Sequence, residues 1–206
     1  MKPIDPAGFE EKFRADLDPW DYTTSPFEAY KRSVLLHACG SQTYGRGLEL
    51  ACAIGETTRY LARRCLQLLA VDSSETALKE ARRRTTCNRR VTLRQALLPA
   101  ETPRGPFDLI VASEIAYYLP ATALSELLRR LDDALEPGGR IVFLHHMRQF
   151  DDASQPPALA QAKIYRAFRQ SMRLVFHERH ARFDVVAFRK PRGPCKRQTK
   201  RRNQSP

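Results

Sequence analysis

Two neighbouring segments, Leu48–Gly55 and Leu69–Asp72, constrain the fold of this chain more than any other part of its sequence. An apolar stretch, a turn of small residues and a second apolar stretch that ends in an acid are typical of a strand–turn–helix–strand unit. The separation of Gly55 and Asp72 matches the roughly 20 residues expected between such a turn and a ribose-binding acid. The pattern predicts an open α/β sheet with a nucleoside pocket, where small residues let the backbone approach the ligand.

The rest of the chain continues the alternation of strands and helices. We expect strands at residues 47–51, 67–71, 91–96, 107–112 and 140–145, and helices at 56–65, 74–84 and 122–135, the last ended by Pro137–Gly139. A helix at 159–169 and two β-prone runs, 171–180 and 182–189, predict a terminal hairpin. The predicted fold class is α/β and Rossmann-like, with a seven-stranded, mostly parallel sheet, an antiparallel C-terminal hairpin strand and helices on both faces.

The two ends of the chain differ from this central region, which we place at residues 41–190. Residues 1–40 predict a helical cap segment, with a short helix at 9–17 and a second at 27–39. Ser25 suits the N-cap of the second helix and Pro26 its first turn. Residues 191–206 predict a disordered basic tail, because they hold several prolines and basic residues and almost nothing apolar.

The charge of the chain is unevenly distributed. The net charge is +12, and residues 190–206 contribute seven basic side chains and no acid. This tail is either solvated or binds an anionic partner such as nucleic acid. The sequence has no run of about 18 apolar residues, so we expect no membrane span. The N-terminus lacks the apolar region of a secretory signal. Five scattered cysteines suit a reducing cytosol, so we expect a cytoplasmic protein.

The turn after the first predicted strand is unusual, because Ala51 and Ala53 stand where glycines are commonest and only Gly55 remains. Alanine does not adopt positive φ cheaply, so an ordinary strand–helix turn is the alternative to a ligand site. Asp72 is either a helix N-cap or the acid that binds ribose. Its place at the end of an apolar strand, at this distance from the turn, favours the ribose role.

Two further candidates end strands at the carboxyl edge, where open α/β sheets place their reacting groups. Glu114 follows the fourth strand, close to Tyr117 and Tyr118, which are candidates for chemistry or for packing under a loop. His145 ends the fifth strand and is either a base in the pocket or a structural polar contact. A metal site is disfavoured, because no third ligand stands at a suitable spacing.

Taken together, these residues resemble the class I S-adenosylmethionine-dependent methyltransferases, and within them the NodS-like group. The class is carried by residues 49–55, Asp72, Phe107–Ile110 and Leu135–Gly139. The group is suggested by residues 18–20, 24–28, 31–32, 52–55 and 113–119, and by His145. The resemblance covers most of residues 9–190 and leaves out the tail.

The resemblance implies that residues 41–190 bind S-adenosylmethionine, leaving S-adenosylhomocysteine as product, without a metal. The site residues that it implies are Glu49, Ala51, Cys52 and Gly55 around the methionine part, Asp72 and Ser73 at the ribose, Ser113 and Glu114 beside the methyl group, and Trp20 and Lys31 in a cap over the site. Glu114 and His145 are the candidate catalytic residues, as bases toward an acceptor amine.

The NodS-like group implies N-methylation of a free amine on a deacetylated chitooligosaccharide or another small molecule. Three positions depart from the family pattern: Ala51 replaces a glycine, Leu97 stands near the usual acid for the adenine amino group, and His146 replaces a tryptophan. They leave open another acceptor, including O-methylation, and a non-catalytic binding protein. Nucleic acid through residues 190–206 is disfavoured as an acceptor, because Ser113–Ala116 replace the motif of base methyltransferases. The oligomeric state is left open.

Overall fold

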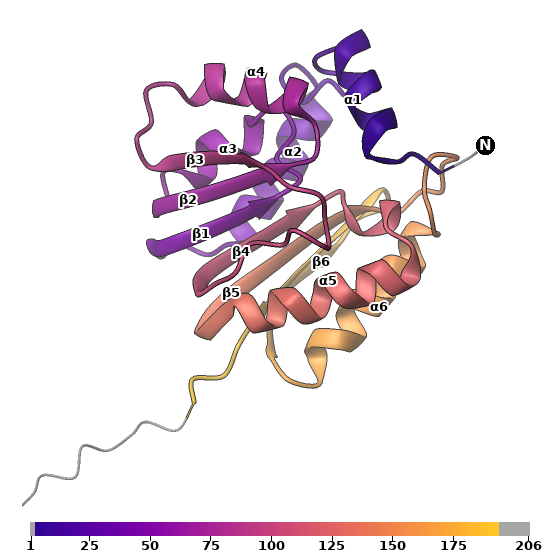
Figure 1. The fold of residues 1–206 in the computed structure, drawn as a ribbon. Helices are drawn as coiled ribbons and strands as arrows, with labels where there is room; N and C mark the ends of the chain where they lie inside the picture. The colour runs from indigo at the N-terminus through magenta and orange to yellow at the C-terminus, as the bar shows by residue number, and fades with distance from the viewer. Residues whose placement is uncertain (1–2, 194–206) are drawn as a thin grey trace, which may run out of the picture.

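Seven strands form one sheet in the order β3-β2-β1-β4-β5-β7-β6 within residues 3–193, the part of the chain that this computed structural model describes (Figure 1). The strands are β1 (Tyr44–Leu50), β2 (Cys65–Asp72), β3 (Val91–Gln95), β4 (Phe107–Ser113), β5 (Leu135–His146), β6 (Arg173–Arg179) and β7 (Phe183–Arg189). Strands β1 to β5 are parallel, whereas β7 runs antiparallel to both β5 and β6. The predicted seven-stranded, mostly parallel sheet is confirmed.

Six α-helices and one short 3₁₀ helix connect or cover these strands within the described residues. They are α1 (Pro6–Ala15), α2 (Pro26–Ala38), α3 (Glu56–Leu61), α4 (Glu75–Thr85), η1 (Ala116–Tyr118), α5 (Ala121–Ala134) and α6 (Pro157–Arg169). Ser25 caps α2 as predicted, and Pro26 is its first residue. Ser74 caps α4 through a 3.0 Å hydrogen bond that its hydroxyl accepts from the Ala77 amide.

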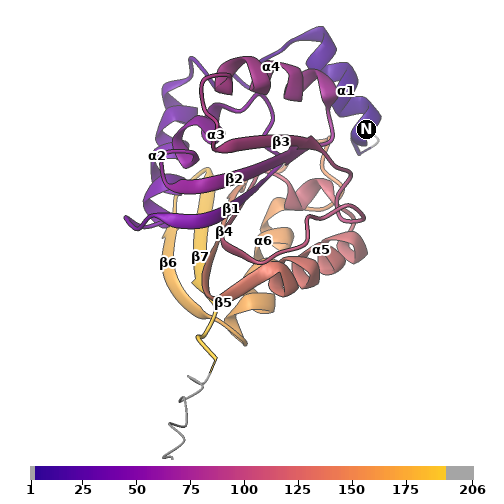
Figure 2. The ribbon, with the colours of Figure 1, turned by 60° about the vertical axis from the view of Figure 1, so that its left-hand side comes forward.

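The sheet is apolar on both faces, because its central strands bury alternate residues in opposite directions. In β4, Leu109 and Val111 pack with α2 and α3, whereas Ile110 and Ala112 pack with α5 and α6. Figure 2 shows α2, α3 and α4 on one side of the sheet and α5 and α6 on the other. Burial on both faces is characteristic of parallel sheets with crossover helices, and it brings the carboxyl ends of β1, β2, β4 and β5 to a single edge.

The largest errors among the predicted boundaries are at the end of α3 and the start of β5. Helix α3 ends at Leu61 instead of residue 65, because Cys65 already pairs with Tyr44 of β1. Helix α5 ends before Pro137 as predicted, but β5 begins at Leu135, opposite Phe107, instead of at residue 140, so that Pro137–Gly139 lie inside the strand. Gly138 takes a φ of 86° there, and its amide donates to the carbonyl of Lys190. Pairing across the sheet therefore decides both boundaries.

The N-terminal helices occupy different layers. Helix α2 packs against β5 and β7, whereas α1 lies beside α4 at the carboxyl edge of the sheet (Figure 1). Within residues 3–193, no helix has the length and apolar composition needed to cross a membrane. The division of the chain at residues 40 and 190 remains a prediction. Most of the predicted basic tail, from residue 194 on, lies outside the described residues.

Candidate functional site

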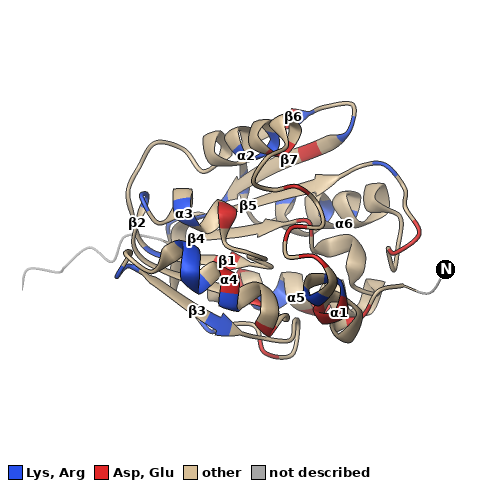
Figure 3. Cartoon of the chain, turned by 90° about the horizontal axis from the view of Figure 1, so that it is seen from above, with Lys and Arg blue, Asp and Glu red and all other residues tan. Residues whose placement is uncertain are grey.

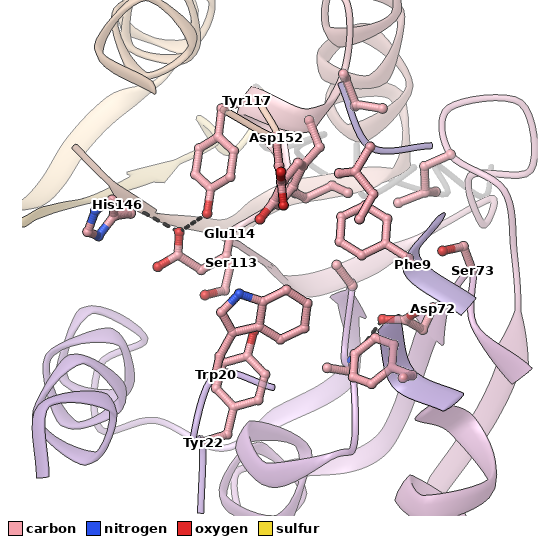
Figure 4. A pocket seen from close by; sticks show the side chains of 18 of the residues that line it. Phe9, Trp20, Tyr22, Asp72, Ser73, Ser113, Glu114, Tyr117, His146 and Asp152 are labelled. Carbon is pink, nitrogen blue, oxygen red and sulfur yellow. Dashed lines mark hydrogen bonds between the residues drawn. The ribbon is translucent and has the colours of Figure 1, made fainter. Parts of the chain in front are cut away.

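A cavity of about 450 Å³ lies at the carboxyl edge of the sheet, between β1, β2, β4 and β5 and the covering segment of α1 and residues 18–25. Its volume is within the roughly 300–1,000 Å³ of small-molecule sites. In Figure 4, Asp72 and Ser73 lie on one side of this space and Glu114, Tyr117 and His146 on the other. We refer to the first side as the cofactor half and to the second as the acceptor half.

The turn after β1 keeps a glycine-like backbone although two of its residues are alanines. Ala51 has a φ of 53°, Ala53 of 47° and Gly55 of 77°. For a residue with a Cβ atom, this left-handed conformation costs about 1–2 kcal/mol. Ala51 and Ala53 both line the cavity, so the strain lies where the backbone approaches the enclosed space.

Asp72 ends β2 and holds this turn in place. One carboxylate oxygen accepts a 2.8 Å hydrogen bond from the Ala53 amide, and the other accepts a 3.0 Å bond from the Ser74 amide. The carboxylate is buried and lines the cavity beside Ser73. Burial raises the pKa of Asp72, although the amide hydrogen bonds oppose that shift. Since Ser74 is the cap of α4, the helix-cap alternative does not account for Asp72.

Glu49 provides a buried carboxyl group next to the same turn. It lines a small space of about 50 Å³ that adjoins the main cavity and also contacts Ala51 and Ser113. Its Oε2 has no hydrogen-bond partner among residues 3–193, and burial raises the pKa of the group to about 8. A buried carboxyl without a partner is costly, and a cationic group of a ligand relieves that cost.

In the acceptor half, three elements, α2, η1 and β5, converge on Glu114. Its Oε2 accepts hydrogen bonds from the Tyr117 hydroxyl at 2.5 Å and the His146 amide at 2.8 Å, drawn as dashed lines in Figure 4. Its Oε1 lies 2.5 Å from Lys31 Nζ, which is also 3.1 Å from Glu28. Glu114 itself has a φ of 56°, so strained backbone occurs in this half of the cavity too.

The charge of Lys31 decides the ionisation of this cluster. Burial by itself raises the pKa of Glu114, but the charge of Lys31 and the hydrogen bonds from Lys31 and Tyr117 hold that pKa below its usual value. Burial likewise acts to lower the pKa of Lys31, and Glu114 and Glu28 outweigh it, so the pKa of Lys31 is raised. The two groups therefore form a buried ion pair with both partners charged.

The two consecutive histidines at the end of β5 have different surroundings. His145 is fully buried, and its Nε2 accepts a hydrogen bond from the Ala116 amide while Nδ1 lies 2.8 Å from Gln161 Oε1. Burial lowers the pKa of His145, so the ring is neutral and both nitrogens are engaged. His145 does not line the cavity, whereas His146 does, which corrects the expectation that residue 145 faces the pocket.

An aromatic cover closes the cavity on the N-terminal side. Trp20 packs against Phe13 and Tyr22, with ring centroids 5.5 and 5.7 Å apart, and Phe9 packs edge-on against Tyr118 at 4.8 Å. In Figure 4, the Trp20 ring lies across the centre of the space. Aromatic walls of this kind suit the faces of a nucleobase or a sugar ring.

Polar contacts hold α1 against the start of α4 and against Asp152. Glu10 of α1 accepts 2.6 Å hydrogen bonds from the hydroxyls of Ser74 and Thr76 at the start of α4. These bonds lower the pKa of Glu10 to about 2. Lys12 pairs with Asp152 at 2.8 Å on the other side of the cavity.

Seven of the eleven sequence-predicted site residues line the main cavity: Trp20, Lys31, Ala51, Asp72, Ser73, Ser113 and Glu114. Glu49 and Cys52 line only the small adjoining space, and Gly55 and His145 line neither. Sequence reasoning missed Phe9, Tyr22, Glu28, His146 and Arg182. Glu28 could have been found from the sequence, because residues three apart lie on one helix face and a glutamate at that spacing can pair with Lys31.

The described residues offer neither a metal centre nor a separated basic surface on the face seen from above. Within residues 3–193, no three His, Cys, Asp or Glu side chains gather as potential metal ligands. In the cartoon of Figure 3, both basic and acidic residues lie along α1 and α4.

Comparisons with known proteins agree with this geometry. A family model described as a methyltransferase domain matches residues 48–141. A protein from Pseudomonas syringae classed as a methyltransferase has a similar solved structure, with 32% identity and a TM-score of 0.69, covering 80% of this chain and 99% of that one. The N-methyltransferase NodS from Bradyrhizobium japonicum WM9, in complex with S-adenosyl-L-homocysteine, has a TM-score of 0.75 at 24% identity, covering 88% of this chain and 98% of that one.

Similarity to nodulation protein S is also found at the level of sequence. The protein of that name from Rhizobium tropici is 32% identical over an alignment of 132 residues that covers 61% of this chain. The match spans 54% of the length of the Rhizobium tropici protein, so this chain is similar to about half of it.

Proposed function

The chain belongs to the methyltransferase family, and on that premise we propose that it is an S-adenosylmethionine-dependent N-methyltransferase. We propose as acceptor an amine of a small molecule or an oligosaccharide. One observation carries this proposal: a single cavity joins a ribose-type acid, Asp72, to an ion-paired carboxylate, Glu114, on its opposite side. The similarity to the N-methyltransferase NodS supports the same class of reaction.

The cofactor half has residues that fit each part of S-adenosylmethionine. The carboxylate of Asp72 would accept hydrogen bonds from the ribose hydroxyls, and the hydroxyl of Ser73 would donate one to them. The turn from Ala51 to Gly55 would lie along the methionine part of the cofactor. The unpartnered carboxyl of Glu49 would bind the ammonium group. Trp20 would cover the ligand. When bound, S-adenosylmethionine supplies a methyl group on a positively charged sulfur, so the protein mainly has to align the acceptor.

The adenine end of the cavity departs from the family pattern. Leu97 is 46% exposed and does not line the cavity, and Ala96, Leu98 and Leu119 supply an apolar wall. Apolar contact with the adenine ring would replace the acid that usually binds the adenine amino group. We therefore expect this site to discriminate less between nucleobases than a site with an acid does.

In the acceptor half, we propose that Glu114 orients the amine and that His146 accepts its proton. Glu114 is ionised and fixed by three partners, so its carboxylate would accept a hydrogen bond from the amine and direct the nitrogen lone pair toward the methyl group. A carboxylate with a lowered pKa is a weak base. His146 lines the cavity, and since burial lowers its pKa its ring is neutral and able to accept a proton. We therefore place the base there instead of at His145, whose two ring nitrogens are both engaged.

The first test is calorimetric titration with S-adenosylhomocysteine of the wild type, Asp72→Ala and Asp133→Ala. Asp133 is an exposed residue of α5 that does not line the cavity, and it serves as the matched control. We expect micromolar binding for the wild type and the control, and at least tenfold weaker binding for Asp72→Ala, since a buried charged acceptor is lost. No binding to the folded wild type refutes a methyltransferase activity and favours a non-catalytic binding protein.

A second test addresses the acceptor. Purified protein is incubated with labelled S-adenosylmethionine and matched pairs of sugars that carry either an amino or a hydroxyl group at one position. Methyl transfer to the amine alone supports the proposal, whereas transfer to the hydroxyl partner replaces it by O-methylation. The acceptor screen also includes RNA and DNA, tested with the full chain and with a chain truncated after residue 193, because the predicted basic tail is the sequence feature that suggests nucleic acid. Truncation there keeps Lys190, which pairs with Gly138 and Gly139.

A reducing compartment suits the cysteines of this chain. Cys39, Cys52 and Cys65 are buried and free, and Cys87 is exposed and free. Free thiols of this kind are typical of proteins kept in a reducing environment, so we propose a cytoplasmic location.

A further inference from the structure

Arg182 is the cation at the cavity that the proposed chemistry does not use. It precedes β7, is exposed, and lines the acceptor half. Its guanidinium carbon lies 3.7 Å from the centroid of the Phe27 ring. No carboxylate of residues 3–193 forms an ion pair with it. The other cations of this region are paired, Lys31 with Glu28 and Glu114 and Lys12 with Asp152.

The backbone places Arg182 next to the reacting groups. Its carbonyl accepts a 2.9 Å hydrogen bond from the Met147 amide, and the neighbouring pair of the same ladder joins His146 to Phe183. His146 in turn donates its amide to Glu114. The centroid of the Phe27 ring, on which Arg182 stacks, also lies 5.6 Å from Lys31 Nζ. Arg182 is therefore at the rim of the acceptor half, away from Asp72 and the cofactor half.

Stacking prepares the guanidinium for one kind of ligand. A guanidinium whose face rests on an aromatic ring keeps its N–H edge free, and that edge matches the two oxygens of a carboxylate or a phosphate. The nearest acids of the cavity, Glu28 and Glu114, both pair with Lys31, at 3.1 and 2.5 Å, and neither forms an ion pair with Arg182. The guanidinium of Arg182 therefore remains available for an anion that arrives with the ligand.

We propose that Arg182 determines acceptor specificity by binding an oxyanion group of the methyl acceptor, so that the preferred acceptor is an amine that also carries a carboxylate or a phosphate. This inference rests on the proposed methyltransferase function and narrows its substrate class. Glu114 would hold the amine end and Arg182 the anionic end, with the ring or chain of the acceptor between them against the aromatic walls.

The test uses protein saturated with S-adenosylhomocysteine and three probes: glucosamine, glucosamine 6-phosphate and glucosaminic acid. The first has no anionic group, and the other two add a phosphate or a carboxylate. Calorimetric affinities are measured for the wild type, Arg182→Ala, Arg182→Lys and Arg173→Ala. Arg173 is an exposed arginine of β6 that does not line the cavity, so it serves as the control for general charge.

We expect at least one anionic probe to bind the wild type and Arg173→Ala about tenfold more tightly than glucosamine. The ratio of the affinity for the anionic probe to the affinity for glucosamine falls to about one in Arg182→Ala. It is intermediate in Arg182→Lys, because lysine keeps the positive charge but lacks the planar guanidinium that binds two oxygens at once. Which probe shows the larger ratio identifies the anion. Affinity for S-adenosylhomocysteine stays within about twofold in all variants.

The assignment is overturned by equal affinities of all probes for the wild type, by no binding of any probe, or by an unchanged ratio in Arg182→Ala. A loss of S-adenosylhomocysteine affinity in Arg182→Ala also overturns it, because Arg182 would then bind the carboxylate of the cofactor. Failure of the folded wild type to bind S-adenosylhomocysteine is a different result, since it removes the proposed function itself.

Discussion

The two halves of the cavity are built by different means. In the cofactor half, the backbone of one turn approaches the ligand space, and Asp72 holds that turn through amide hydrogen bonds from Ala53 and Ser74. In the acceptor half, Lys31 of α2, Tyr117 of η1 and the backbone of β5 converge on Glu114. The first half follows from the order of neighbouring parallel strands, whereas the second depends on three separate elements meeting around one charge.

This difference predicts different responses to substitution. A group held by main-chain amides keeps its surroundings when a nearby side chain changes, because the amides remain. A buried carboxylate compensated by one cation loses that compensation as soon as the cation is removed. Substitutions should therefore affect stability most in the acceptor half and ligand affinity most in the cofactor half.

The largest expected effect is that of Lys31→Met. It leaves Glu114 buried without its cation, and we expect the free energy of unfolding to fall by about 3–5 kcal/mol. The measurement is urea unfolding followed by circular dichroism. Since side-chain exposures of Lys31 and Glu114 are only 8% and 15%, solvent screens the pair little.

The double variant Lys31→Met with Glu114→Gln is the control for this effect. Removing both charges should restore part of the lost stability, because Glu28, the second partner of Lys31, is then the one carboxylate of the cluster left without its cation. A loss in Lys31→Met below about 1 kcal/mol, or a double variant no more stable than the single one, contradicts a strongly coupled buried pair.

A smaller effect is expected from pH in the cofactor half. Glu49 has a pKa of about 8 without a ligand, and a bound ammonium group favours its ionised form. Binding below pH 8 therefore releases a proton, and the affinity for S-adenosylhomocysteine should rise with pH by up to about tenfold per unit and level off near pH 8. Titration at pH 6, 7 and 8 measures this slope.

Glu49→Gln provides the comparison, because it removes the titrating group and should flatten the slope. The same group has an opposite effect on stability. The folded chain holds a proton on Glu49 that the unfolded chain loses, so this group lowers the free energy of unfolding as pH rises from 4.5 to 8. An affinity that is independent of pH in the wild type disproves the link between Glu49 and the ammonium group.

The smallest expected effect concerns the strained turn. Ala51→Gly and Ala53→Gly each remove a Cβ atom from a left-handed residue, and we expect each to raise the free energy of unfolding by about 0.5–1 kcal/mol. Ala29→Gly, in an exposed part of helix α2, is the matched control and should lower it by about 1 kcal/mol. Equal destabilisation of all three variants excludes strain at the turn.

The sequence predicted the cofactor half better than the acceptor half, for a physical reason. Asp72 and the turn at Ala51 belong to one local unit, whose periodicity and spacing are visible in a short segment. The sheet followed from the repetition of such units. Boundaries that depend on cross-strand pairing, as at Leu135, were misplaced because their partners are distant in the chain.

The acceptor half was only partly predictable. Glu114 was placed by its strand end and Lys31 by the resemblance, but their pairing needs helix α2 to lie across the sheet, which no local pattern states. The alternation of β5 implies that His145 and His146 face opposite sides. Which side meets the cavity is decided by the packing of η1 and α6 around His145.

The alternation in β5 limits how this protein can change over evolutionary time. Residues 141–144 pair without interruption with β4 on one side, and residues 141–146 pair with β7 on the other. An insertion or deletion of one residue there would exchange His145 with His146 and detach the amide that binds Glu114. Replacement of the His146 side chain leaves that amide in place. Descendants of this chain can therefore acquire new acceptors by substitution at the end of β5, but not by altering its length.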